Sequence, residues 1–86
     1  MKWFYVYALF NASLQRFYIG VTADLKRRLK QHNWAKKSYR NKSYKIIFFE
    51  AYLNKKDALR RERYLKSTKG KYALKTMLQE TLKTLK

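Results

Sequence analysis

The sequence contains no cysteine and no proline, and its only glycines are Gly20 and Gly70. Without cysteine, the fold cannot be held by disulfides, and zinc sites built from thiolates are excluded. The lack of cysteine is compatible with a reducing, cytoplasmic location. No segment approaches the roughly 20 consecutive apolar residues that a membrane-spanning helix needs. The apolar segment 1–10 alternates like a strand and lacks the cleavage site of a signal peptide.

Acidic residues are also scarce, since five Asp and Glu stand against 22 Lys and Arg, for a net charge of +17 over 86 residues. Positive charges in such excess repel one another and oppose compact folding, so a need for solubility alone does not explain them. The basic residues are spread along the chain instead of forming one amphipathic helix, which argues against a membrane surface. We expect DNA as the partner, with RNA as the alternative, and no obligate protein partner.

The apolar residues, 47% of the chain, suffice for one small core. No linker, repeat or low-complexity segment divides the chain, so we expect a single domain over residues 1–86. Alternating and β-branched runs predict strands, and apolar stripes at helical spacing predict helices. The predicted strands are 4–9, 17–21 and 44–52, and the predicted helices are 24–33, 55–66 and 71–85. This ββαβαα order is typical of an α+β fold with a three-stranded antiparallel sheet flanked by helices.

Local signals support these boundaries. Residues 11–13, Asn-Ala-Ser, suit a hairpin connection between the first two strands. Thr22 or Asp24 is a candidate N-cap for the first helix. Asn54 is the candidate for the second, with Asp57 three residues later in a capping-box arrangement.

Two tyrosines on the first hairpin are candidate functional residues. Side chains alternate between the two faces of a strand. If Val6 and Ile19 face the core, then Tyr7 and Tyr18 share the opposite face, beside Gly20. A glycine in a strand allows another group to approach the backbone closely. The alternative is that both tyrosines are ordinary strand residues, because tyrosine is common in β-strands.

Arg28 and His32 lie on the apolar stripe of the first predicted helix, in line with Leu25 and Leu29, whereas Arg27 points elsewhere. An arginine on a core-facing stripe is costly unless a partner satisfies it. That partner is either a phosphate or, more simply, a carboxylate. A lone histidine such as His32 is more often structural than catalytic.

Glu62 lies on the apolar face of the second predicted helix with Ala58 and Leu65. An acid among so many bases either pairs with one of them or holds a cation between itself and a phosphate. Mg²⁺ is typically bound in proteins by one or two carboxylates, several waters and the phosphate itself.

Four segments in order resemble the GIY-YIG nuclease superfamily. Residues 5–7, Tyr-Val-Tyr, resemble its "GIY" strand, with a tyrosine in place of the glycine. Residues 18–20, Tyr-Ile-Gly, match its "YIG" strand. Residues 22–32 and 57–66 are similar to the helices that follow in the small single-domain bacterial branch. The resemblance covers about residues 3–75.

The resemblance implies roles for individual residues. Arg28 takes the place of the arginine that contacts the scissile phosphate, and Glu62 that of the metal-binding glutamate. One of the two tyrosines is the expected general base, and we favour Tyr18. The residues assigned to catalysis are Tyr7, Tyr18, Arg28, His32 and Glu62. Further contacts with nucleic acid are assigned to Gly20, Arg27 and Lys66.

The resulting hypothesis is a DNA endonuclease that uses Mg²⁺ or Mn²⁺ and selects substrate structure more than sequence, with DNA repair as its expected setting. The first alternative is a non-catalytic DNA- or RNA-binding module on the same fold. The second is a structural protein of the ribosome or nucleoid. A pure binding protein has no need of Glu62, so this residue discriminates between them.

Overall fold

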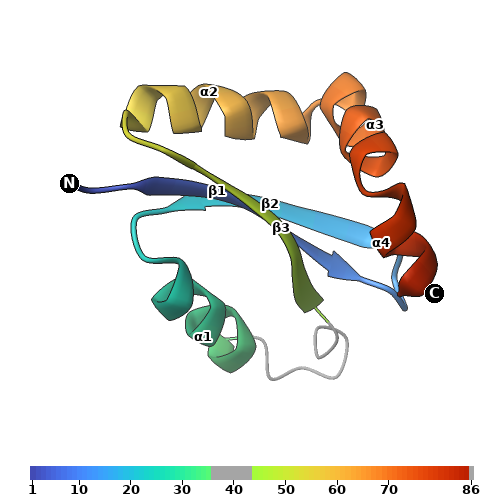
Figure 1. Ribbon diagram of the computed structural model, residues 1–86. Helices are drawn as coiled ribbons and strands as arrows, with labels where there is room; N and C mark the ends of the chain where they lie inside the picture. The colour runs from blue at the N-terminus through green and yellow to red at the C-terminus, as the bar shows by residue number, and fades with distance from the viewer. Residues whose placement is uncertain (36–43, 86) are drawn as a thin grey trace.

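The computed structural model describes residues 1–35 and 44–85, and for residues 31–35 it describes the backbone alone. Three antiparallel strands form one sheet in the order β2-β1-β3, with helices on both sides (Figure 1). The predicted α+β fold is confirmed. Its elements are β1 (Phe4–Asn11), β2 (Arg16–Thr22), α1 (Leu25–Ala35), β3 (Tyr44–Tyr52), α2 (Lys55–Lys66), α3 (Thr68–Met77) and α4 (Gln79–Thr84).

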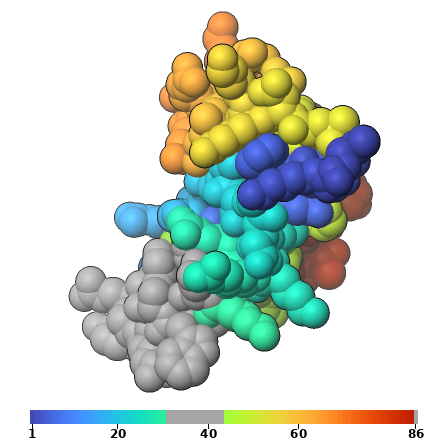
Figure 2. All heavy atoms as spheres, turned by 90° about the vertical axis from the view of Figure 1, so that its left-hand side faces the viewer, coloured from blue at the N-terminus to red at the C-terminus, as the bar shows by residue number. Residues whose placement is uncertain are grey.

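The hydrophobic core lies between the sheet and α2. Burial of apolar side chains is the dominant force that holds such a layer together. The buried core residues come from β1, β2, α2 and α3, and they are Val6, Ala8, Ile19, Ala58, Leu65 and Leu74. In Figures 1 and 2, α2 and α1 lie on opposite sides of the sheet. The alternation predicted for the first hairpin is therefore confirmed, with Val6 and Ile19 on the core face.

The β1–β2 hairpin turns at residues 12–15, which overlap the connection predicted at residues 11–13 but begin after Asn11. Asn11 is 1% exposed, and its Oδ1 accepts a hydrogen bond from the backbone N of Leu14 at 3.0 Å. Gln15 has a φ of 53°, in the left-handed region that asparagine or glycine adopts more readily. Its side chain donates to the carbonyl of Ala12 at 2.7 Å. A local side-chain bond thus closes a turn that contains no glycine.

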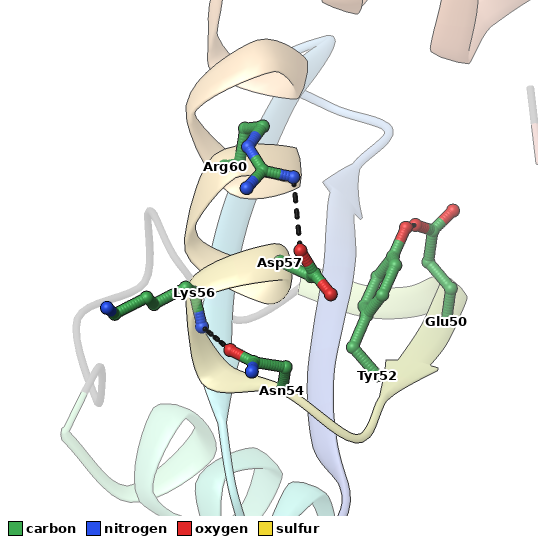
Figure 3. A network of polar contacts seen from close by, with 6 residues as sticks. All are labelled: Glu50, Tyr52, Asn54, Lys56, Asp57 and Arg60. Carbon is green, nitrogen blue, oxygen red and sulfur yellow. Dashed lines mark hydrogen bonds and ion pairs between the residues drawn. The ribbon is translucent and has the colours of Figure 1, made fainter.

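The predicted N-caps are present. Asp24 Oδ1 accepts from the backbone N of Arg27 at 3.1 Å, so Asp24 caps α1. Asn54 Oδ1 accepts from the backbone N of Lys56 at 2.8 Å and caps α2, as Figure 3 shows. The bounds predicted for α2 agree with the structure. The carboxylate of Asp57 accepts from Arg60 Nη1 at 3.1 Å, an exposed pair on the outer surface of α2.

The single helix predicted over 71–85 is wrong, because the structure has two helices, and the first of them begins at Thr68. Ser67 ends α2 and also caps α3, since its hydroxyl accepts from the backbone N of Gly70 at 3.1 Å. At Leu78 the backbone leaves helical geometry, with φ −110° and ψ 23°. A Cβ on Gly70 would collide with the carbonyl oxygen of Tyr64. Glycine at this position therefore allows the close crossing of α2 and α3.

Candidate active site

Tyr7 and Gly20 face each other across the β1–β2 pair. A Cβ on Gly20 would lie 2.5 Å from Tyr7 Oη, which is closer than real Cβ contacts come. The glycine therefore makes room for the Tyr7 ring, which is fully buried. The group that approaches the Gly20 backbone is thus a phenol of the neighbouring strand. The predicted contact of Gly20 with nucleic acid stays a prediction.

Tyr18 lies beside Tyr7 on the sheet face opposite the core. The two ring centroids are 6.3 Å apart, with the planes tilted by 31°. The prediction that these two phenols share one face is confirmed. The two tyrosines differ in accessibility, because Tyr7 has no exposed surface and Tyr18 is half-buried. Tyr18 is therefore the phenol that a substrate can reach more easily.

Arg28 connects α1 to both phenols. Its Nε donates a hydrogen bond to Tyr7 Oη at 3.3 Å. Hydrogen bonding to Tyr7, and more weakly to Tyr18, raises the pKa of the guanidinium above its already high value. The predicted inward orientation is only partly right, since the residue as a whole is exposed while its guanidinium reaches the sheet. Among the residues described, its partners are phenols, and none of the ion pairs includes it.

The protonation of Tyr7 follows from its surroundings. Burial raises its pKa, and the hydrogen bond from Arg28 opposes this effect; the nearby Tyr18 and the charge of Glu62 raise the pKa further. The net shift is upward from 10.0. A phenol with a pKa above 10 is protonated at neutral pH, so Tyr7 holds its proton.

Glu62 brings a carboxylate to this region from α2. Its helical neighbours Ala58 and Leu65 are fully buried, and its own side chain is 21% exposed. The predicted apolar setting is therefore confirmed. Lys66 Nζ lies 3.3 Å from Glu62 Oε2, one helical turn away. Because the charge of Glu62 acts on the pKa of Tyr7, the carboxylate lies within electrostatic range of the phenol.

The donor set suits a cation that needs little protein ligation. In the part of the chain that the structure describes, no three His, Cys, Asp or Glu residues gather in a group that could hold a metal. A cage of several protein ligands is therefore absent there. A single half-buried carboxylate remains, which fits an ion that keeps most of its waters, as Mg²⁺ does.

Three assigned residues remain, namely Arg27, Lys66 and His32. Arg27 is exposed on α1, beside Arg28 in sequence, and its backbone N is used by the Asp24 cap. Lys66 is brought to the cluster through its ion pair with Glu62. His32 falls within the backbone of α1, but its side chain lies outside the described residues.

One feature of this region was missed from the sequence. Arg61, the neighbour of Glu62, holds Glu50 on β3 with two hydrogen bonds, from Nε at 3.0 Å and from Nη2 at 3.3 Å. Tyr52 donates to the same carboxylate, toward which it turns in Figure 3. Burial, and then the bond to Glu50, raise the pKa of Tyr52. This bidentate pair ties α2 to the sheet next to Glu62.

Two phenols, a guanidinium and a carboxylate thus come together from three layers around a three-stranded sheet. The GIY-YIG catalytic domain family matches residues 3–76, and the chain belongs to this family. A UPF0213 protein from Bacillus halodurans, solved by NMR in solution, is similar in fold, with a TM-score of 0.56 and 28% sequence identity over 87% of this chain and 84% of that one. No curated protein matches the chain.

None of the helices in residues 1–35 and 44–85 has both the length and the apolar character needed to cross a bilayer.

Proposed function

We propose that this chain is an endonuclease that hydrolyses phosphodiester bonds of DNA with the help of one divalent metal ion, Mg²⁺ or Mn²⁺. The observation that carries the proposal is the linkage of four groups from four elements. Tyr7 of β1 accepts from Arg28 of α1, stacks near Tyr18 of β2 and senses the charge of Glu62 on α2. A nuclease needs an anion binder, a proton acceptor and a cation ligand, and this cluster holds one candidate for each.

Arg28 is the proposed binder of the scissile phosphate. Its raised pKa keeps it charged at any physiological pH, and its exposed position leaves donors available to a ligand. A guanidinium has five donors in a planar fork, so the bond to Tyr7 leaves others for phosphate oxygens. Because the bond holds the group in place before the substrate arrives, it is suited to stabilising charge that develops in the transition state.

The two phenols have different proposed roles. Tyr7 is buried and protonated, so it orients Arg28 and is a poor proton acceptor. Tyr18 is accessible and lies in the same cluster, so it is the proposed base that takes a proton from the attacking water. The sequence led to the same choice of Tyr18, and the choice stays a proposal.

Glu62 is the proposed ligand of the metal ion. When bound, such an ion supplies a Lewis acid for the phosphate and the leaving oxygen. Lys66 neutralises this carboxylate through its ammonium. We propose that Lys66 turns from Glu62 toward the phosphate backbone when a cation is held there. The side chain of Lys66 is 55% exposed, so water is available to the ammonium when it leaves the carboxylate.

The same ion pair favours a second candidate, a binding module without catalysis. If Lys66 neutralises Glu62 permanently, the carboxylate has a structural partner and needs no metal. The domain would then bind DNA or RNA through its net charge of +17. The two candidates differ in turnover and not in affinity, so a cleavage assay separates them.

The test is incubation of the purified protein with linear, nicked, flapped and branched DNA, each with Mg²⁺, Mn²⁺ or EDTA. We expect metal-dependent cutting, faster on flapped or branched DNA, because the phosphates at junctions and ends reach a small site more easily than those within a duplex. Equal binding of all substrates without a cut in either metal would favour the binding module. A parallel set of RNA substrates decides between the two nucleic acids.

A further inference from the structure

Tyr72 on α3 is unusually exposed for an aromatic residue. Its side chain is 75% exposed, more than any other large apolar residue described except Met1. The buried residues of the same helix, Gly70 and Leu74, face α2 and the core. Tyr72 therefore points away from the protein, and the fold does not require an aromatic ring at this position.

The surroundings of Tyr72 are basic. Lys69 precedes it by three residues and Lys75 follows it by three, so both lie on its side of the helix. Within its ten residues, α3 has three lysines and no acid. Neither Lys69 nor Lys75 belongs to an ion pair in the described part of the chain. Over six residues a helix rises about 9 Å, so the backbones of the two lysines lie one on each side of Tyr72 along the helix axis.

A comparison with Tyr64 shows what is particular to Tyr72. Tyr64 lies near the same corner between α2 and α3 and is 42% exposed. The guanidinium carbon of Arg61 lies 5.5 Å from the centroid of its ring, so one face of Tyr64 is already covered. No residue that the structure describes stacks on Tyr72. Its ring is thus a vacant aromatic surface between two cations.

We propose that the solvent face of α3 binds an unpaired stretch of nucleic acid, with one base stacked on Tyr72 and the adjoining phosphates held by Lys69 and Lys75. Aromatic rings on a basic surface bind single strands, because every unpaired base offers a face for stacking. In a duplex those faces are covered by neighbouring base pairs, so the surface selects unpaired substrate. The inference rests on the proposed nucleic-acid function and deepens it by naming the substrate class.

The position of this surface relative to the site supports its use. α2 carries Glu62 and ends at Lys66, and α3 begins two residues later at Thr68. Lys66, which pairs with Glu62, therefore lies only two residues before the helix that carries Tyr72. Substrates with a single-stranded segment next to a duplex, such as flaps, would meet both parts of the protein.

The test is direct binding of a labelled single-stranded oligonucleotide and of the blunt duplex of the same sequence, measured by fluorescence anisotropy in EDTA. We expect Tyr72→Ala to weaken single-strand binding about tenfold, within the range found when base–aromatic stacking is removed. Binding of the duplex should stay within about twofold of wild type. Tyr72→Phe keeps the ring and should bind as wild type, whereas Tyr72→Leu keeps apolar bulk but loses stacking and should behave like Tyr72→Ala.

Tyr64→Ala is the matched control, since Tyr64 is a tyrosine 42% exposed on the neighbouring helix and Arg61 already covers one face of its ring. It should leave single-strand binding unchanged. Equal losses for Tyr72→Ala on single strand and duplex, or no loss at all, would overturn the inference. Because no metal is present, the outcome is independent of cleavage. If Tyr72→Ala does not weaken single-strand binding but the wild-type protein cuts DNA when metal is added, this inference fails and the proposed nuclease function stands. If Tyr72→Ala weakens single-strand binding selectively but no DNA is cut in any metal, the inference stands and the nuclease function fails.

Discussion

Nε of Arg28 lies 3.3 Å from the phenol oxygen of Tyr7, a residue 21 positions earlier in the chain. This hydrogen bond joins the first turn of α1 to the central strand of the sheet. It restrains a long, exposed side chain that would otherwise sample many rotamers. A guanidinium held in this way has lost part of its freedom before a phosphate binds, and this is the basis of the first prediction.

Arg28→Ala should lower the cleavage rate at saturating DNA by about 10²–10³-fold, the usual effect of losing one preorganised charge stabiliser. Arg27→Ala removes the same charge from the adjacent position, where the side chain has no described contact with the phenols. It should mainly weaken DNA binding. Single-turnover rates and binding constants for both variants make the comparison. Similar rate losses at saturation would show that the contact with Tyr7 is irrelevant to catalysis.

Gly20→Ala should destabilise the fold and disturb the site together. The new Cβ would meet the Tyr7 ring, with Oη at 2.5 Å, so the ring or the strand must shift. Overpacking of this kind typically costs about 1–3 kcal/mol of unfolding free energy. Chemical denaturation gives the stability change, and the single-turnover cleavage rate reports on the site.

The double variant Tyr7→Ala, Gly20→Ala isolates the cause. If the clash with the ring is the reason for the glycine, Gly20→Ala should cost almost nothing once Tyr7 is alanine. A penalty of the same size in both backgrounds would point to the backbone of β2 and not to Tyr7.

The hairpin that positions Tyr7 could be predicted because its signal is local. The alternation of Val6 with Tyr7 and of Ile19 with Tyr18 already separates the core face from the site face. The break at Leu78 was not predicted, because the leucine stripe from Leu74 onward has helical spacing on both sides of Leu78. Backbone bonds from Leu78 to Leu74 and from Leu82 to Leu78, at 3.0 and 2.9 Å, keep that stripe almost continuous.

The pKa of Tyr7 gives a prediction that needs no substrate. The folded protein binds this phenol proton more tightly than the unfolded chain does. The free energy of unfolding should therefore be insensitive to this group below the ordinary tyrosine pKa near 10, and should fall as the pH rises above it. Tyr7→Phe should reduce that alkaline loss of stability.

Ultraviolet difference titration measures the same property directly. Burial raises the pKa of both Tyr7 and Tyr52, so each of these two phenols should ionise at a higher pH than an ordinary tyrosine. Tyr7→Phe and Tyr52→Phe should each remove one tyrosine that ionises at high pH. An unchanged titration curve for Tyr7→Phe would contradict the buried, protonated state assigned to Tyr7.

The proposed division of labour between the phenols gives a kinetic prediction. Tyr18→Phe should slow cleavage strongly, because the proposed base is lost. Tyr7→Phe should have a smaller effect, because it removes only the acceptor that orients Arg28. Thermal melts check that both variants are folded. A larger rate loss for Tyr7→Phe than for Tyr18→Phe would reverse the assignment, and two fully active variants would exclude a phenol base.

The contacts between elements could be predicted only in part. The helical spacing placed Glu62 between Ala58 and Leu65, and the structure agrees. The bond between Arg61 and Glu50 was missed, because it joins a strand to a helix and depends on the register of β3, which shifts against β1 between Ala8 and Leu9. Sequence spacing describes one element at a time, and it cannot give such a contact.

The central claim is that Glu62 holds the metal ion used to cut DNA. The most direct measurement is the single-turnover cleavage rate of wild type and Glu62→Ala in Mg²⁺ at saturating DNA, with Glu80→Ala as the control. Glu80 is an exposed acid on α4 paired only with Lys83, so its loss changes the net charge equally. We predict that Glu62→Ala abolishes cleavage while DNA affinity stays equal or rises, and that Glu80→Ala cuts as wild type does. Cleavage by Glu62→Ala at the wild-type rate would contradict the account.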